Sequence, residues 1–307
     1  KLVDDGEATV VIGTQTLIQE SIDFSSLGLV VVDEQHRFGV RQRLALRAKG
    51  ENSDLLVLTA TPIPRTLALT LYGDLDISVL SSRPGGKSVA DQIKTKYMSE
   101  KNREKAHNLI RREAAAGRQT YIVCPLIDES DKLELKSVLK EADLLKTKFF
   151  PDLNVGLLHG RMPSAEKEAV MRAFRLGELD ILISTTVIEV GVDIPNATVM
   201  MIEHAERFGL SQLHQLRGRV GRGTCSSYCL LFGKIKTDEA RARIKAIMST
   251  HDGFQLAEAD LKIRGEGQLF GQRQSGLPDL KLARLTKDIK LLEIARAEAI
   301  ALVEKDP

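Results

Sequence analysis

Residues 29–36 read Leu29-Val30-Val31-Val32-Asp33-Glu34-Gln35-His36, four apolar residues in succession followed at once by two carboxylates. The apolar residues do not alternate with polar ones, which is typical of a strand that is covered on both faces, as in a parallel sheet. Similar apolar runs recur along the chain, and we expect each to form a strand. They are residues 9–12, 55–58, 119–123, 155–158, 181–183, 199–202 and 228–232.

Helical stretches lie between several of these runs. The clearest covers residues 164–176, where Ser164 can cap the first turn, apolar residues share one face, and Gly177 ends the helix. Strands that alternate with helices predict parallel sheets with crossover helices, hence an α/β fold.

Turn-forming residues at 81–87 mark the expected domain boundary. We therefore expect one domain in residues 1–83 and a second in residues 84–235. Residues 236–307 should form a tail with helices at 238–248, 254–263 and 283–304 and a glycine-rich loop at 264–276.

The composition is that of an ordinary globular chain: 43% of the 307 residues are apolar and 28% are charged. Because 44 Lys and Arg nearly balance 42 Asp and Glu, net charge does not identify a nucleic-acid binder. Apolar runs are far shorter than the roughly 20 residues of a membrane helix. Cys124, Cys225 and Cys229 lack the spacing of a metal site, so reduced thiols and a cytoplasmic location are expected.

Asp33 and Glu34 follow the apolar run directly, and ligands of parallel sheets sit at the carboxyl ends of strands. Asp33 could bind a nucleotide-bound Mg²⁺, and Glu34 could orient and deprotonate an attacking water. Acidic residues after a strand are common, however, and a purely structural role stays open on this evidence alone.

Two hydroxyl residues, Thr59 and Thr61, follow the next apolar run. They could relay the state of a nucleotide site to a bound strand. The alternative is helix capping, because Thr61 before Pro62 suits an N-cap followed by proline in the first turn.

Gln215-Leu216-Arg217-Gly218-Arg219-Val220-Gly221-Arg222-Gly223 is the strongest single motif. Arginine is almost never fully buried without a partner, so we do not expect this segment to lie in a core. Glycines let the backbone approach a ligand closely, and guanidinium groups bind phosphate. Arg219 and Arg222 are therefore candidates to neutralise a transferring phosphoryl group, with a solvated basic loop as the alternative.

The segments DEQH (33–36), TATP (59–62) and QLRGRVGR (215–222), in this order, resemble the motifs of superfamily-two helicases. HGRM (159–162) and TTVIEVGVDIPNA (185–197) resemble further motifs of the second motor domain. The resemblance implies tandem RecA-like lobes of the P-loop NTPase class, the first one truncated, with a helical hairpin and loop behind them. It implies that an acidic pair on the first lobe and arginines on the second meet across a nucleotide.

The resemblance also distributes roles over single residues. It places Gln215 with the catalytic group and His36, Gly191 and Asp193 at the nucleotide, Asp193 at the ribose. It places a larger set against nucleic acid: Gly13, Thr14, Gln15, Thr59, Thr61, His159, Gly160, Arg161, Thr185 and Thr186.

Longer segments are similar to the RecG family: residues 33–43, 59–68, 159–171 and the tail from 252 to 276. The similarity implies a monomeric enzyme that uses ATP and Mg²⁺ to move on branched double-stranded DNA, remodelling stalled forks and Holliday junctions. Arg264 and Gln274 would couple the motor to DNA. The sequence departs from the family pattern at Glu266 and Gln268, which leaves the rigidity of that loop open.

Two other functions remain open. One is the motor of the transcription-repair coupling factor, which shares the tail motif. The other is a catalytically silent DNA-binding fragment, since no GxxxxGK[ST] segment occurs and residues 85–88 lack its spacing. The chain as printed reads as a fragment, and we expect it to bind ATP weakly.

Overall fold

The structure is a computed structural model that separates into two compact units, residues 1–62 and 63–307. It describes residues 5–19, 22–33, 45, 49–50, 53–59, 76, 78, 80, 93–125, 139–140, 142–185, 193–264 and 289–305. The boundary expected at residues 81–87 lies outside these ranges.

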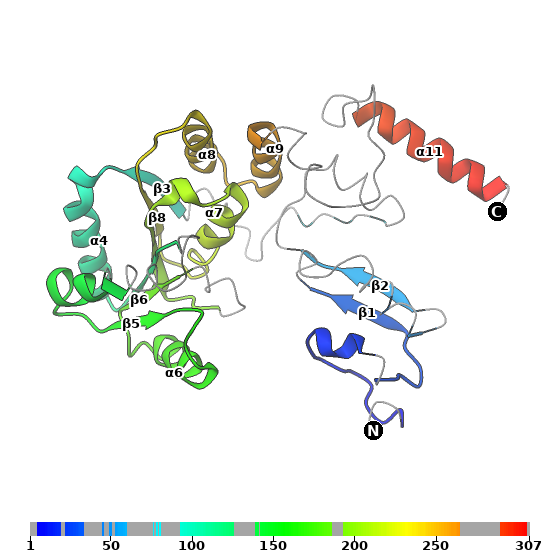
Figure 1. Cartoon of the computed structure of the whole chain (residues 1–307), viewed down its shortest axis with the longest axis horizontal. Coiled ribbons are helices and arrows are strands. Elements are labelled where there is room, and N and C mark those ends of the chain that lie inside the picture. The colour runs from blue at the N-terminus through cyan, green and yellow to red at the C-terminus, as the bar shows by residue number, and fades with distance from the viewer. Residues whose placement is uncertain are drawn as a thin grey trace. The chain divides into compact units, whose positions relative to one another are not determined.

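The first unit contains a two-stranded parallel sheet, drawn in blue in Figure 1. Strand β1 (Leu29–Val32) pairs with β2 (Asp54–Val57), with Val32 opposite Val57. Val30 and Val32 are the buried residues of its small core. A short 3-10 helix, η1 (Gln15–Ile18), precedes the sheet.

The strand expected at residues 9–12 is wrong. These residues have no strand geometry, and Val10 and Ile12 are 77% and 93% exposed. A strand needs a hydrogen-bonded neighbour, and none of the described strands pairs with this segment. β-Branched residues alone do not supply that neighbour.

A six-stranded parallel sheet forms the core of the second unit, with strand order β3-β8-β7-β4-β6-β5. The parallel pairing confirms the predicted α/β fold. In chain order the strands are β3 (Ile93–Met98), β4 (Gln119–Val123), β5 (Val155–Leu158), β6 (Ile181–Ser184), β7 (Ala197–Ile202) and β8 (Ser227–Phe232).

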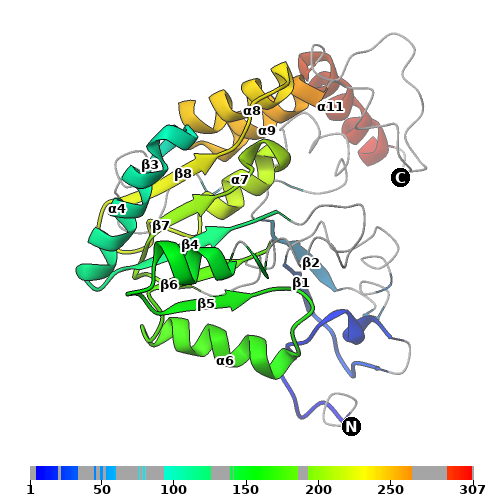
Figure 2. The ribbon, with the colours of Figure 1, turned by 60° about the vertical axis from the view of Figure 1, so that its left-hand side comes forward.

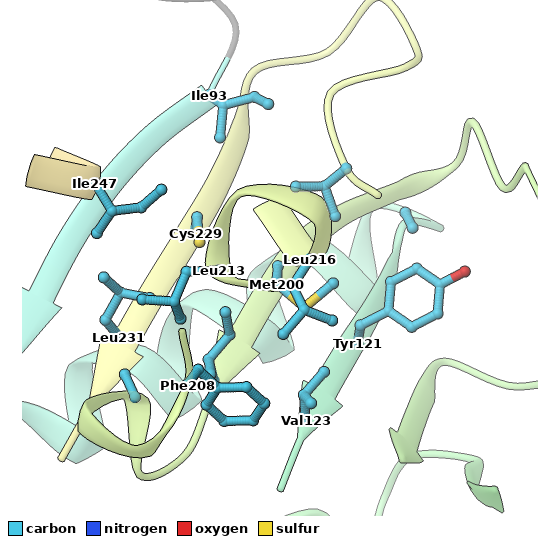
Figure 3. Packing of buried hydrophobic residues seen from close by; sticks show 14 of the residues in the cluster. Ile93, Tyr121, Val123, Met200, Phe208, Leu213, Leu216, Cys229, Leu231 and Ile247 are labelled. Atoms are coloured by element: carbon cyan, nitrogen blue, oxygen red, sulfur yellow. The ribbon is translucent and has the colours of Figure 1, made fainter. Parts of the chain in front are cut away.

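Helices cover both faces of this sheet, so the central strands β4, β6 and β7 are buried along their whole length (Figure 2). One face carries α6 (Ser164–Arg175), α7 (Leu210–Arg217), α8 (Asp238–Ser249) and α9 (Gly253–Arg264). The other face carries α4 (Arg103–Ala115) and the π-helical turn η4 (Leu145–Phe149). Figure 3 shows the first face, where Leu213 and Leu216 of α7 lie against Met200 and Leu231 of the sheet.

Strand β3 was missed from the sequence because its residues alternate between buried and exposed positions. It lies at one edge of the sheet, where Lys94 and Lys96 are compatible with a strand that pairs on one side. Short 3-10 turns, η3 (Glu100–Asn102) and η6 (Ala205–Arg207), follow β3 and β7.

The helix predicted at 164–176 is confirmed as α6, but its N-cap residue is Pro163, and Ser164 already belongs to the helix. Gly177 follows the C-cap with φ +77°, a conformation that suits glycine. The helices expected at 238–248 and 254–263 are present as α8 and α9. The last expected helix is observed as α11 (Ile289–Lys305).

Candidate functional site

In the first unit, Asp33 and Thr59 lie at the same edge of the two-stranded sheet. Asp33 directly follows β1, and Thr59 lies two residues beyond the end of β2. The backbone N–H of Leu58 donates to the carbonyl oxygen of Val32 at 2.8 Å, which keeps the two strand ends side by side. Both residues take part in interactions with neighbouring groups. The sequence therefore predicted correctly that each of these residues follows a strand of a parallel sheet, and the structure adds that the two strands are neighbours.

Three expected residues of the first unit, Glu34, His36 and Thr61, lie outside the described part of the chain. Gly13 and Thr14 are exposed and immediately precede η1, whose first residue is Gln15. The hydroxyl of Thr14 is 3.0 Å from that of Thr16.

At the carboxyl edge of the six-stranded sheet, His159, Gly160 and Arg161 follow strand β5. Gly160 and Arg161 are exposed, and the Lys167 ammonium donates to the carbonyl oxygen of Gly160 at 2.6 Å. Burial lowers the pKa of His159, and the charges of Lys167 and Arg161 lower it further. The imidazole is therefore neutral at pH 7, and the positive charge of this turn comes from Lys167 and Arg161.

Thr185 follows the neighbouring strand β6, and its N–H donates to the carbonyl oxygen of Leu158 at 3.2 Å. Its side chain is fully buried. Among the described residues, neither Thr185 Oγ1 nor His159 Nδ1 has a hydrogen-bond partner. Unpaired buried polar atoms are rare and costly, so this edge holds unused hydrogen-bonding capacity. Thr186 lies outside the described residues.

At the opposite, amino-terminal edge, Asp193 precedes β7 and Arg222 precedes β8. The Arg222 guanidinium pairs with the Asp193 carboxylate at 3.1 Å and also donates to the carbonyl oxygen of Gly218 at 3.0 Å. Both side chains are partly exposed, at 36% for Arg222 and 57% for Asp193. Gly191 lies outside the described residues.

Glycines shape the backbone around this ion pair. A Cβ atom on Gly223 would lie 2.7 Å from the carbonyl oxygen of Pro195, so only glycine fits this close to the backbone that precedes β7. Gly221, directly before Arg222, has φ +77°, a left-handed conformation that suits glycine. These contacts lie within the protein, so close approach of these glycines to a ligand stays a prediction.

Both guanidinium groups also act on Tyr121, a buried residue of β4. Burial raises the pKa of the Tyr121 hydroxyl to about 12, and the nearby charges of Arg219 and Arg222 oppose that rise. Arg219 is partly buried and has neighbouring interaction partners. Arg219 and Arg222 thus form one positive region at the amino-terminal edge of the sheet.

The expectation that the whole arginine segment lies outside the core is wrong for Arg217. This residue is 2% exposed. It is buried because the carbonyl groups of Ile247 and Thr250 accept hydrogen bonds from its guanidinium at 2.7 and 2.9 Å. Burial of arginine is tolerated where every donor finds a partner. Gln215, two residues earlier in α7, is partly buried.

Sequence reasoning also missed a buried charge at the carboxyl edge, Glu203. It follows β7 and is 3% exposed. Arg103, at the start of α4, pairs with both Glu203 carboxylate oxygens and lies 4.5 Å from the ring centre of Phe232. Glu203 directly follows a strand, as Asp33 does. This position after an apolar run could have identified it from the sequence.

Other features bear on the class of protein. Arg264 is the last residue of α9, and Gln274 lies outside the described residues. The three cysteines are free. Among the described residues, no cluster of three potential metal ligands occurs, and no helix has the length and apolar content to span a membrane.

Two protein-family models match this chain. Residues 101–224 match the helicase conserved C-terminal domain. Residues 250–307 match the C-terminal part of domain 3 of ATP-dependent DNA helicase RecG. The first match contains His159, Asp193 and Arg222, and the second contains α9 and α11.

Curated relatives are similar over nearly the whole chain. ATP-dependent DNA helicase RecG of Synechocystis is 54% identical over 98% of this chain and 36% of its own length. The RecG protein of Bacillus subtilis is 48% identical over 98% of this chain and 44% of its own length. The chain thus spans less than half the length of these relatives.

A solved structure of RecG bound to a three-way DNA junction superimposes with a TM-score of 0.71 at 45% identity, over 95% of this chain and 37% of that one. The DNA-bound helicase MrfA, 20% identical with a TM-score of 0.51, shares the fold. Similarity at this level along the motor and tail segments shows that the chain belongs to the RecG family of helicases.

Proposed function

We propose that this chain carries motor and coupling residues of an ATP-dependent translocase that moves on branched double-stranded DNA. In the whole protein this activity remodels stalled replication forks and Holliday junctions. The observation that carries the proposal is the 54% identity to a RecG helicase, which extends through the arginine segment and the tail. The relative solved with a three-way DNA junction supports the choice of substrate.

The side chains at the amino-terminal edge suit a nucleotide. Arg222 presents a partly exposed guanidinium, which matches the oxygen geometry of phosphate, and Asp193 presents a carboxylate able to accept from a ribose hydroxyl. We assign Arg219 and Arg222 to charge neutralisation at the phosphates and Gln215 to their support. In the first unit we assign Asp33 to Mg²⁺ and Glu34 to the attacking water, with His36 beside them.

ATP supplies the phosphoryl group when bound, and Mg²⁺ shields its charge. The parallel-strand end that carries Asp33 supports this assignment, because carboxylate oxygen is a preferred ligand of Mg²⁺. Asp33 would hold the ion, and Glu34 would accept a proton from water at its carboxylate.

The carboxyl edge of the second unit suits a phosphate backbone. Gly160 and Arg161 are exposed and follow the half-buried His159, and the charges on Arg161 and Lys167 are positive. Contacts of this kind bind DNA without reading its sequence and weaken as salt rises. We assign Thr186 to the same surface, and Gly13, Thr14, Gln15, Thr59 and Thr61 to DNA contacts of the first unit.

The tail favours RecG over the transcription-repair coupling factor, because residues 250–307 match a RecG domain model. We assign Arg264, at the end of α9, and Gln274 to coupling between ATP use and DNA movement. We also propose that the protein works as a monomer in the cytoplasm, where its three free cysteines would stay reduced.

The proposal is tested with Glu34→Gln in the full-length protein. Loss of a catalytic base should lower junction-stimulated ATP hydrolysis by about 10²–10⁴-fold, while nucleotide binding changes little. Glu7→Gln, at an exposed position of the same unit, is the matched control and should retain wild-type turnover.

Unchanged turnover of Glu34→Gln would remove that residue from its role. A wild-type protein that binds junctions but never hydrolyses ATP in response would contradict the whole proposal. It would leave the catalytically silent DNA-binding protein as the better account.

A further inference from the structure

We propose that Arg217 is a positioning residue that links the arginine loop of the motor to the turn between α8 and α9 in the tail. This inference rests on the proposed function, because it concerns how nucleotide-dependent motion would reach the DNA-coupling segment. It assigns to Arg217 a role that differs from those of Arg219 and Arg222.

The contacts of Arg217 run from α7 to the end of α8. Its Nη1 donates to the carbonyl oxygens of Ile247 at 2.7 Å and Thr250 at 2.9 Å. Its Nη2 lies 3.1 Å from Nδ1 of His214, which accepts the hydrogen bond because the guanidinium has no acceptor atom. Among the residues that the structure describes, Arg217 has one of the largest fully buried side chains.

The C-terminus of α8 needs donors from elsewhere. The last carbonyl groups of a helix lack partners within the helix. The final turn of α8 contains no basic residue, and Thr250 behind it is extended, with φ −144° and ψ 152°. Arg217 therefore supplies both the hydrogen-bond donors and the positive charge that favour this helix end.

The polar connection continues into α9. The Oγ1 of Thr250 accepts from the N–H of Asp252 at 3.1 Å. The Asp252 carboxylate in turn accepts from the N–H groups of Phe254 at 2.8 Å and Gln255 at 3.3 Å, in the first turn of α9. Arg217 thus binds Thr250, and Thr250 binds Asp252, the residue that caps α9. Helix α9 ends at Arg264.

In the other direction, Arg217 is joined to the nucleotide-facing loop. It is the last residue of α7, and the next residue, Gly218, accepts through its carbonyl oxygen from Nε of Arg222 at 3.0 Å. Figure 2 shows α7, α8 and α9 packed side by side, and their contacts confirm it. A shift of the loop must therefore move the turn after α8, or else break hydrogen bonds in a buried place, which is costly.

The surroundings of Arg217 do not require a charge for packing. Two preceding residues of α7, Leu213 and Leu216, belong to a hydrophobic cluster that also contains Ile247 and Leu256, and Figure 3 shows the first three of these on one face of the sheet. A methionine would fill a similar volume there. A buried cation costs desolvation that an apolar residue does not, which favours a directional role over a packing role.

The test measures the number of base pairs unwound per ATP hydrolysed on a three-way junction, with the full-length protein. This ratio does not depend on the fraction of molecules that fold, because misfolded molecules drop out of both quantities. Arg217→Met should lower the ratio by about tenfold, with ATP turnover per folded molecule largely kept. Arg217→Lys should fall between Met and wild type, because an ammonium donates but lacks the planar fork.

Arg111→Gln is the matched control. The Arg111 guanidinium also donates to a backbone carbonyl, that of Phe149, on the opposite face of the sheet. Its removal should leave the ratio at the wild-type value even if the variant is less stable.

A wild-type ratio in Arg217→Met would overturn the inference, even if both activities fell together, because a parallel fall reports lost structure alone. If Arg217→Met does not fold, the ratio of Arg217→Lys decides, and a wild-type value there overturns it equally. Failure of the proposed function would instead appear in the wild-type protein as absent ATP hydrolysis.

Discussion

The two edges of the six-stranded sheet differ in the exposure and pairing of their polar side chains. At the amino-terminal edge, Arg222 and Asp193 are partly exposed and satisfy each other. At the carboxyl edge, Thr185 Oγ1 and His159 Nδ1 are buried and have no hydrogen-bond partner among the described residues. The ion pair of the amino-terminal edge is partly exposed, whereas the carboxyl edge holds unpaired buried polar atoms beside its buried Arg103–Glu203 pair.

This difference indicates how each edge could meet a ligand. An exposed ion pair contributes little stability, so Arg222 can leave Asp193 for a phosphate at low cost. A ligand that forms hydrogen bonds with buried unpaired atoms lowers the free energy, because it removes the cost of leaving them unpaired. We therefore assign the nucleotide to the amino-terminal edge and the DNA backbone to the carboxyl edge of the same lobe, as two separable sites.

The largest expected effect is that of Arg222→Gln on ATP turnover. An arginine that neutralises a transferring phosphoryl group contributes about 10³–10⁵-fold to the rate, so kcat should fall by at least about 10³. A steady-state ATPase assay of the full-length protein at saturating junction DNA measures it. A fall of less than tenfold would remove Arg222 from the catalytic group.

A smaller effect is expected for Asp193→Asn. The amide keeps the shape of the side chain but loses the charge that holds Arg222, and it still reaches a ribose hydroxyl. We expect the KM for ATP to rise by about tenfold, equivalent to about 1.4 kcal/mol, with kcat little changed. An equal fall of kcat in Asp193→Asn and Arg222→Gln would show that the two side chains act as one unit.

The smallest effect concerns pH and the carboxyl edge. Because the pKa of His159 is lower in the folded protein than in the unfolded chain, the unfolded chain binds more protons as the pH falls below about 6.5. The stability that the neutral imidazole contributes is therefore complete above that pH and is lost below it. His159→Gln should show a smaller loss of unfolding free energy between pH 7 and pH 5.5 than wild type, measured by denaturant titration. An identical pH dependence would contradict burial of this imidazole.

The sequence predicted the central strands well, because β4, β6 and β7 are buried on both faces and so are rich in apolar residues that do not alternate with charged ones. It failed for β3, whose alternating residues reflect an edge position, and for residues 9–12, where strand-forming residues lack a described neighbour. Edge position and pairing depend on tertiary contacts that a local pattern does not contain.

Arg222 was a candidate from its chemistry and spacing and Asp193 from the resemblance to helicase motifs, and the structure brings the two side chains to 3.1 Å. Arg217 was misjudged, because the carbonyl groups that make its burial possible belong to Ile247 and Thr250, some thirty residues away. Glu203 was missed for the same reason, since its partner Arg103 lies on α4. Burial of a charge depends on such distant partners.

The central claim, that the two edges are separable sites, is tested most directly by nucleotide-free binding of a fluorescent three-way junction to two matched variants of the full-length protein. Arg161→Gln should weaken binding several-fold, because a phosphate contact is lost. It should also make the slope of log affinity against log salt concentration shallower by about one. Arg222→Gln should bind as wild type does. The reverse result, with Arg222→Gln weakened and Arg161→Gln unchanged, would contradict the assignment of the edges.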